Sequence, residues 1–167
     1  VVDGLFGQMA SLVNGGSAFQ WALDITGLAG TDAAAIDAMM AEVPAGCDGL
    51  RVRPTLAAGG GEGLAFGHQG CITGLTLACT QGHLLRATIE GLACELARNL
   101  AIFEASDITL ERLILTGGAG KSTLTPQILA DVTGLPITCV TEPDTSAFGA
   151  GVLARAMVTG QPLAELA

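Results

Sequence analysis

A regular recurrence of large residues between positions 81 and 105 is the clearest structural signal in the chain. They recur at steps of three and four residues, which places them on one face of an α-helix. These positions are Leu84, Leu85, Thr88, Ile89, Leu92, Leu96, Leu100 and Phe103. Between them, Gly91 and the alanines at 87, 93 and 97 would let a neighbouring element approach closely. The pattern therefore predicts a long helix that packs closely against its neighbours.

The polar residues of this helix are expected to serve its structure. Its charged residues predict a solvated face, on which Arg86 and Glu90 form an ion pair one helical turn apart. The other charged members of this face are Glu95 and Arg98. His83, at the start of the helix, is interpreted as a packing or hydrogen-bonding residue rather than a catalytic one.

Weaker patterns predict alternating helices and strands in the rest of the chain. Helices are expected at 17–26, 32–43, 124–132 and 147–157, with strands at 50–53, 112–116 and 136–140. Ser17, Asp32 and either Thr145 or Ser146 are the expected N-caps of three of these helices. Strands that alternate with helices indicate an α/β layer structure. We interpret residues 1–167 as a single domain.

The segment 57–74 is expected to be a long loop. It is rich in glycine and has neither helical nor strand periodicity. Long loops inside compact domains are usually functional or mobile. His68 lies in this segment with no partner residue at metal-ligand spacing.

Composition and charge narrow the classes of function. Hydrophobic residues make up 50% of the 167 residues and charged residues 14%, which excludes a disordered chain. The net charge of −9 comes without a basic stripe, which argues against a nucleic-acid partner. No apolar run is long enough to span a bilayer, so no membrane partner is expected. So few charges also indicate apolar surface that a further lobe or a subunit covers, and a homo-oligomer is one such arrangement.

The cysteines and the first residues indicate where the protein is located and whether the chain is a fragment. The five cysteines are odd in number and lack C-x-x-C spacing, which favours reduced thiols in a cytoplasmic protein. No signal-like segment opens the chain. Because it begins mid-pattern and without Met, we expect a fragment of a longer gene product.

The segment 116–123, Thr-Gly-Gly-Ala-Gly-Lys-Ser-Thr, is the strongest candidate for chemistry. It lies between a predicted strand and a predicted helix. In this arrangement backbone N–H groups and the positive end of a helix dipole point at a phosphate, so we expect a nucleotide site. We call this segment the glycine turn.

Its spacing fits neither common phosphate-binding motif. A P-loop needs a glycine five residues before Gly120, where Leu115 stands. A dinucleotide turn of the form G-x-G-x-x-G needs a third glycine where Thr123 stands. A tight turn with a purely structural role remains an alternative.

Several segments together resemble the FGGY family of carbohydrate kinases. The glycine turn and the following 127–136 resemble the family's adenosine-binding segment. The other similar segments, in the family's order, are 14–21 (its Gly-Gly-Ser-x-x-x-Trp helix start), 70–76 with 83–93 (its Gly-Leu-Thr loop and long helix) and 148–154 (its closing helix). Within the loop, Gln69 stands where the family has Arg, and 56–63 replaces its Gly-Glu-Arg-x-Pro segment.

The resemblance implies a fold, an activity and a set of site residues. It implies an actin-like, ribonuclease-H-like lobe with a mixed sheet flanked by helices, forming most of the C-terminal, nucleotide-binding lobe of a two-lobe kinase. It further implies ATP-dependent phosphorylation of a sugar or polyol hydroxyl, with Mg²⁺ offsetting charge. The nucleotide contacts by position are Gly16, Gln20, Gly117, Gly118 and Ser122. Ser122 could instead simply cap the following helix, and Gln20 could be a surface residue. Because the family does not require a lysine at position 121, Lys121 is interpreted as a solvated side chain rather than a phosphate ligand.

The resemblance leaves catalysis to a lobe that this chain does not include. The family's general-base Asp and most of its sugar contacts lie in the N-terminal lobe, so we assign no catalytic or metal-binding residue here. We expect the fragment alone to be inactive and to bind nucleotide weakly. The sugar stays open, with a mild preference for a pentulose. A non-catalytic actin-like module and a P-loop ATPase are the alternatives.

Overall fold

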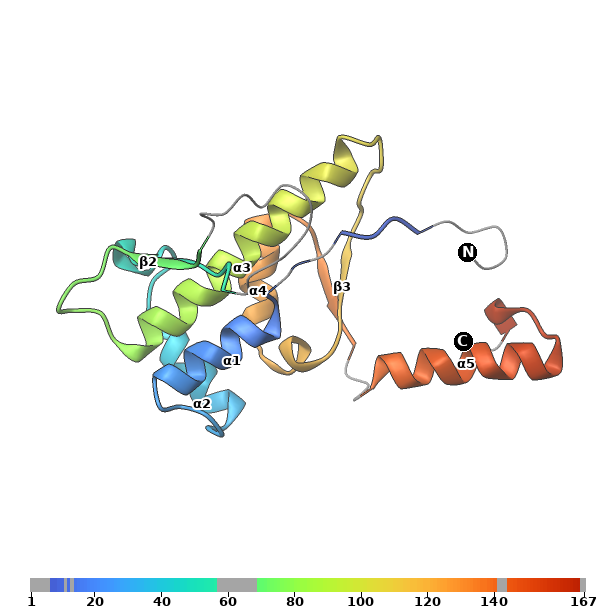
Figure 1. Cartoon of the computed structure of the whole chain (residues 1–167), viewed down its shortest axis with the longest axis horizontal. Coiled ribbons are helices and arrows are strands. Elements are labelled where there is room, and N and C mark those ends of the chain that lie inside the picture. Colours follow the sequence, from blue (N-terminus) through green and yellow to red (C-terminus); the bar gives the residue numbers. More distant parts are fainter. Residues whose placement is uncertain (1–6, 11, 13, 57–68, 141–143, 166–167) are drawn as a thin grey trace.

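The computed structural model describes residues 7–10, 12, 14–56, 69–140 and 144–165. Its longest element, α3 (Gln81–Glu104), crosses the middle of the molecule, with α1 (Gly16–Ile25) and α2 (Ala33–Ala41) on one side of it (Figure 1). At the other end of the chain, α5 (Thr145–Thr159) lies apart from the other helices (Figure 1). The helices predicted from periodicity are therefore present.

A capping box fixes the start of α3. The Thr80 side chain accepts a hydrogen bond from the His83 N–H (3.4 Å), and the Thr80 N–H donates to His83 Nδ1 (3.2 Å). These bonds satisfy backbone groups that the first turn of a helix leaves without partners. The other ring nitrogen of His83 lies 3.2 Å from Asp48 Oδ2. The hydrogen-bonding role predicted for His83 is thus confirmed.

The main hydrophobic core lies where α1, α2 and α3 meet α4 (Thr125–Thr133). Its buried residues come from all of these helices and are Ala22, Ile36, Met40, Leu85, Ile89, Ala93, Ile128 and Leu129. Burial of a large aliphatic side chain stabilises a fold by roughly 1.5–3 kcal/mol. The small residues Ala22 and Ala93 are fully buried, which shows that the helices approach one another closely.

A second, smaller core lies between α3 and a strand pair. In this pair β1 (Arg51–Arg53) runs antiparallel to β2 (Cys71–Thr73), with Val52 opposite Ile72. A Cβ on Gly91 would collide with the carbonyl oxygen of Val52, so glycine lets α3 lie directly against β1. The close approach predicted at Gly91 is confirmed.

The prediction of an uninterrupted loop from 57 to 74 is wrong at its end, because Cys71–Thr73 is a strand. A strand this short, beside glycine, carries no periodicity of its own. Pairing with β1 orders it, and a side-chain hydrogen bond from Arg53 Nη2 to the Gln69 carbonyl oxygen (2.6 Å) supports the pairing. The rest of that prediction, 57–68 with His68, lies outside the described residues.

The expected solvated face of α3 is also partly wrong. Arg86 and Glu90 do pair (2.9 Å), but their side chains are only 12% and 21% exposed. Glu90 also accepts a hydrogen bond from the Gly46 N–H (3.1 Å), and Arg86 donates to the Met40 carbonyl oxygen (3.2 Å). The pair is turned inward because it satisfies backbone groups between α2 and β1. By contrast, the Arg98 side chain of the other pair is 65% exposed, as predicted, whereas that of its partner Glu95 is only 23% exposed.

The strand–turn–helix–strand unit around the glycine turn forms as predicted. The strands β3 (Leu113–Leu115) and β4 (Ile137–Cys139) pair in parallel, with Ile114 opposite Thr138. They are joined by the short helix η2 (Gly118–Lys121) and by α4. The described strands thus form an antiparallel and a parallel pair in separate small sheets, flanked by helices.

Two of the predicted N-caps are wrong. Gly15 precedes α1, so Ser17 lies inside the helix. Asp144 caps α5, accepting a hydrogen bond from the Ala147 N–H (2.9 Å), whereas Thr145 and Ser146 are helical. A carboxylate caps as well as a hydroxyl does. The predicted cap at Asp32 is confirmed, since its side chain accepts from the Ala34 N–H (3.1 Å).

Candidate functional site

The glycine turn presents exposed backbone at the end of β3. Gly117 has φ +77°, a conformation that L-residues other than glycine rarely adopt. The chain then turns through η2, in which no residue is buried, and the Gly120 N–H donates to the Gly117 carbonyl oxygen (3.1 Å). Lys121 is exposed, as predicted, and forms no ion pair with the described residues.

Open space lies in front of three glycines that the sequence selects for the site. A Cβ built on Gly16, Gly117 or Gly118 would meet no described atom within 4 Å. Gly117 needs its positive φ, but neither Gly16 nor Gly118 has one. Within the described chain, therefore, neither packing nor backbone conformation requires glycine at 16 or 118. At these two positions the backbone carries no side chain, so another molecule can approach it.

Ser122 is the most constrained of the predicted site residues. Its hydroxyl donates to Asp37 Oδ1 (2.7 Å) and accepts from the Thr125 N–H (2.9 Å). The latter bond supports the start of α4, so the alternative capping role is present in the structure. Ser122 is half-buried, which leaves part of it accessible from outside.

Asp37 is the polar residue of this region that the sequence analysis missed. Its other oxygen, Oδ2, accepts from the Thr123 N–H (2.6 Å) and the Thr123 hydroxyl (2.9 Å). Asp37 is only 9% exposed and lies on α2, far from the glycine turn in sequence. The available signal was a single acidic residue within the otherwise apolar run 33–41.

The other two predicted residues lie on α1, beside the same hydrophobic core. Gln20 is exposed, and its Nε2 donates to Asp24 Oδ1 (2.9 Å). Its neighbour Phe19 packs against the main core, as does Leu124 just after the glycine turn. Phe19 and Leu124 thus place both predicted parts of the site beside the main core.

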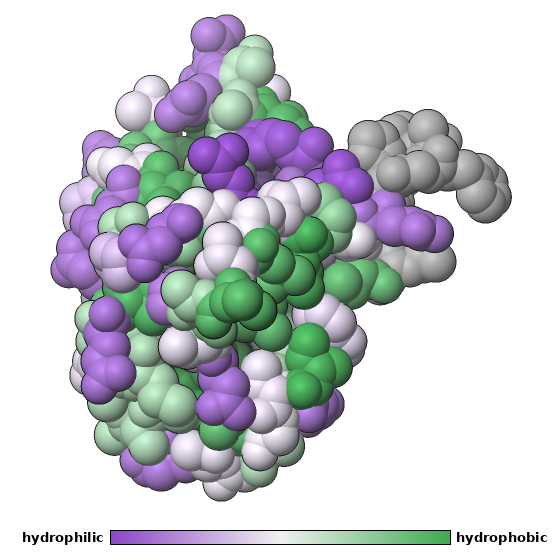
Figure 2. All heavy atoms as spheres, turned by 90° about the vertical axis from the view of Figure 1, so that its left-hand side faces the viewer, coloured by the Kyte–Doolittle hydropathy of each residue, from purple (hydrophilic) through white to green (hydrophobic). Residues whose placement is uncertain are grey.

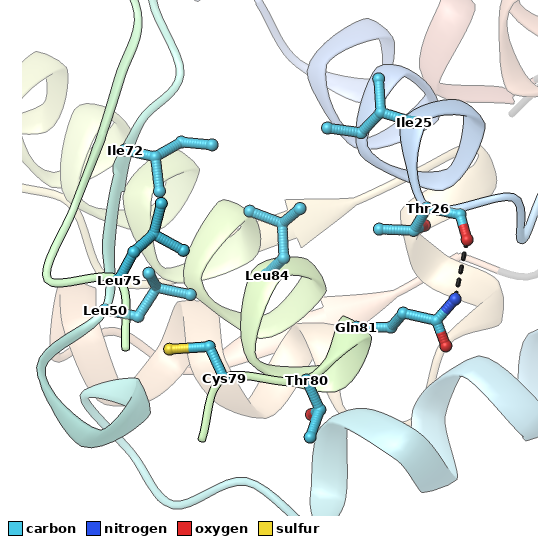
Figure 3. Close-up of a pocket in the computed structure, with 9 residues that line it drawn as sticks. All are labelled: Ile25, Thr26, Leu50, Ile72, Leu75, Cys79, Thr80, Gln81 and Leu84. Atoms are coloured by element: carbon cyan, nitrogen blue, oxygen red, sulfur yellow. Dashed lines mark hydrogen bonds between the residues drawn. The ribbon is translucent and has the colours of Figure 1, made fainter. Parts of the chain in front are cut away.

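A cavity of about 480 Å³ lies in a different part of the molecule. It opens between the end of α1, the strand pair and the start of α3, and none of the predicted nucleotide contacts lines it (Figure 3). Its walls are mainly apolar, with Leu75 and Ile25 exposed at 66% and 52%, and Gln81 Nε2 donates to the Thr26 carbonyl oxygen (2.7 Å). Figure 2 faces the left-hand side of Figure 1 and shows hydrophobic side chains gathered near the middle of that face.

In the part of the chain that the structure describes, no group of three or more His, Cys, Asp or Glu side chains could hold a metal ion. None of the described helices is both long and apolar enough to cross a membrane.

The sequence matches known proteins along nearly its whole length. Residues 1–158 match the model for the C-terminal domain of the FGGY family of carbohydrate kinases. A glycerol kinase from Desulforamulus reducens is 33% identical over 157 residues, which cover 90% of this chain and 31% of that protein. A ribulokinase from Mycolicibacterium smegmatis is 39% identical over 88 residues, covering 53% of this chain and 16% of that protein.

Solved structures agree with the sequence matches. A xylulose kinase from Rhodospirillum rubrum superimposes with a TM-score of 0.72 at 34% identity, covering 86% of this chain and 29% of that one. The predicted α/β, actin-like lobe is thereby confirmed as the fold class. The chain spans about a third of the length of the glycerol kinase it matches.

Proposed function

The chain belongs to the FGGY family of carbohydrate kinases, and on that premise we propose that it supplies the adenosine-binding lobe of an enzyme that transfers the γ-phosphoryl group of ATP to a sugar or polyol hydroxyl. The glycine turn would form one wall of the adenosine pocket, and the start of α1 would form another. Gly16, Gln20, Gly117, Gly118 and Ser122 are the residues proposed to face the nucleotide.

The observation that carries this proposal is the open backbone at Gly118. A side chain there would clash with nothing in the described chain, and its φ is not positive. A glycine that its own fold does not need is explained if a ligand lies against the backbone. Ser122 and the exposed Gln20 add polar groups that suit a nucleoside, because they can exchange hydrogen bonds with its base and its ribose hydroxyls.

The phosphates and Mg²⁺ would be held mainly outside this chain. The described residues include no cluster of carboxylates that fits a metal ion, and the glycine turn is too short to enclose a phosphate chain in the manner of a P-loop. Mg²⁺ would supply charge compensation for the transferred phosphoryl group. Phosphoryl transfer depends on positioning and charge stabilisation, so this chain would contribute by orienting ATP.

The acceptor alcohol and the compartment are proposed more broadly. The matched proteins include a glycerol kinase, a ribulokinase and a xylulose kinase, which fits a small polyol or a ketopentose as acceptor. All five cysteines are free thiols, which fits a protein of the reducing cytoplasm.

Titration of the 167-residue chain with ATP tests the proposal. The amide NMR signals of Gly117 and Gly118 are expected to shift, with a dissociation constant near millimolar. Gly118→Val should weaken binding about tenfold or more, because its side chain fills the space next to the turn. The matched control is Gly149→Val, which alters a glycine of α5 that also faces open space and should leave binding unchanged.

The same titration separates the proposal from the alternative nucleotide sites. Lys121→Ala should change ATP affinity less than threefold, whereas a P-loop protein would lose binding. Binding tenfold tighter than millimolar, lost in Lys121→Ala, would overturn our proposal. A coupled assay with ATP and glycerol, xylulose or ribulose should detect no turnover by the chain alone.

A further inference from the structure

We propose that Asp37 is the positioning residue of the nucleotide site, and that it makes Ser122 a pure hydrogen-bond acceptor towards the ligand. The proposal rests on the function proposed above. As a consequence, Ser122 would select ligands that offer it a hydrogen-bond donor. In adenosine that donor is either the 6-amino group of the base or a ribose hydroxyl.

The first step is the geometry around the Asp37 carboxylate. It receives three hydrogen bonds from the end of the glycine turn: from the Ser122 hydroxyl (2.7 Å), the Thr123 N–H (2.6 Å) and the Thr123 hydroxyl (2.9 Å). It forms no ion pair with any described residue. Hydrogen bonds to an ionised acceptor are roughly twice as strong as neutral ones. The carboxylate therefore holds the end of the turn to α2.

The second step concerns the rigidity of that anchor. Asp37 lies on α2 together with Ile36 and Met40, and both of these residues are buried in the main core. The contact therefore fixes the end of the glycine turn to the packed helices. Hydrogen-bonded support of this kind keeps a binding group in the geometry that the ligand needs.

The third step is a count of the hydrogen-bonding capacity of Ser122. A serine hydroxyl has one donor and two acceptor sites. Its donor is used on Asp37, and one acceptor site is used by the Thr125 N–H. One acceptor site remains for a ligand. A carboxylate such as Asp37 cannot donate, so the Ser122 hydroxyl points its proton at Asp37 and not at a ligand.

Replacing Asp37 by asparagine would reverse this constraint. The amide can still accept from Thr123 through its oxygen, while its NH₂ group donates to Ser122. The Ser122 hydroxyl would then be free to donate to a ligand as well as to accept. Selectivity for a donor group on the nucleotide should be lost, although the variant keeps the shape of the side chain.

The test compares ATP with analogues that each lack one donor, by NMR titration of the 167-residue chain. Inosine triphosphate carries a 6-oxo acceptor in place of the 6-amino donor, and 2′-deoxy-ATP and 3′-deoxy-ATP each lack one ribose hydroxyl. In the wild-type chain, at least one of these analogues should bind about five- to tenfold more weakly than ATP, the loss expected for one hydrogen bond. That analogue also identifies the donor group.

The variants then show whether Asp37 causes this selectivity. In Asp37→Asn and in Ser122→Ala the penalty should fall below twofold. Asp131→Asn is the matched control, because Asp131 also accepts a side-chain hydrogen bond, from Gln127 (2.7 Å), but on the exposed face of α4. The control should keep the penalty. A merely structural role of Asp37 would weaken all the nucleotides equally and leave their ratios unchanged.

Each outcome decides between the two proposals. If ATP shifts no signal at Gly117 or Gly118 of the wild-type chain, the proposed function fails. If ATP binds but every analogue binds equally well, or if the penalty persists in either variant, the role of Asp37 is wrong. Should Asp37→Asn fail to fold, Asp37→Ala takes its place, since it also frees the Ser122 hydroxyl to donate and should likewise lower the penalty below twofold.

Discussion

Glycines have opposite environments in two regions of this molecule, namely around α3 and at the glycine turn with α5. Around α3, glycines are pressed against neighbouring backbone: a Cβ on Gly82 would collide with the Met39 carbonyl oxygen, and one on Gly91 with that of Val52. At the glycine turn and along α5, the glycines at 117, 118, 149 and 151 face open space. No described residue of η2 or α5 is buried.

The difference separates glycines that the packing of the fold requires from glycines that it does not require. On the α3 side they let helices and strands approach closely, so the fold itself accounts for them. On the other side the positive φ of Gly117 accounts for that glycine, but nothing in the described chain accounts for the glycines at 118, 149 and 151. At the glycine turn we propose a nucleotide. Along α5, the exposed Phe148, Met157 and Val158 leave an apolar surface that the described residues do not cover.

The largest expected effect is on the stability of the α3 side. Gly91→Ala should lower the free energy of unfolding by about 3 kcal/mol, because the new methyl group meets the backbone oxygen of Val52, which cannot move aside cheaply. Gly118→Ala should change it by less than about 0.5 kcal/mol. Urea unfolding measures both values. Equal destabilisation by the two variants would remove the distinction between the two sides.

The ion pairs of α3 sharpen the comparison within a single helix. Glu90→Ala should cost about 2 kcal/mol, because it leaves the half-buried Arg86 and the Gly46 N–H without their acceptor. Glu95→Ala should cost less than about 0.5 kcal/mol, since its partner Arg98 is exposed to water. If both substitutions have the same effect, the inward position of Arg86 and Glu90 contributes nothing to stability.

A buried thiol gives the α3 side a distinct pH dependence. Burial, assisted by the nearby Glu90 carboxylate, raises the pKa of the Cys47 thiol from 9.0 to about 12. The folded state therefore keeps a proton that the unfolded state loses above pH 9. This stabilisation is complete below pH 9 and declines as the pH rises towards 12, by at most about 1.4 kcal/mol per pH unit.

Comparison with Cys47→Ala isolates this effect. Between pH 8.5 and 10, the wild-type chain should lose about 1 kcal/mol more stability than the variant, measured by urea unfolding at each pH. At pH 8, iodoacetamide should label the exposed Cys71 and Cys94 and leave Cys47 unmodified until the chain unfolds. Rapid labelling of Cys47 in the folded chain would show that this region opens easily.

The smallest effect is expected on α5. Met157→Ser should change the free energy of unfolding by less than about 0.5 kcal/mol, because the Met157 side chain is 87% exposed and packs against nothing that would be lost. Backbone amides of α5 should also exchange with deuterium faster than those of α3. A destabilisation above 1 kcal/mol would show that α5 is covered in solution.

The sequence predicted most of the fold where the signal was local and long. The recurrence of Leu84, Leu85 and Ile89 marked α3, and the run of apolar residues before a glycine turn marked β3. The strand Cys71–Thr73 was not predicted, because its three residues are ordered by pairing with β1. In the candidate site, the sequence singled out Gly118 and Ser122, but it could not reveal that Asp37, 85 residues before Ser122, holds the end of the turn.

What the sequence determined by itself was the family, the order of helices and strands, and the position of the glycine turn, because each depends on residues close together in the chain. Only the tertiary structure decided which glycines are packed and which are open, which way Arg86 and Glu90 face, and what binds the Ser122 hydroxyl. The reason is physical. Packing and hydrogen bonding between distant segments depend on distances that folding sets, and a residue's type does not specify its partner.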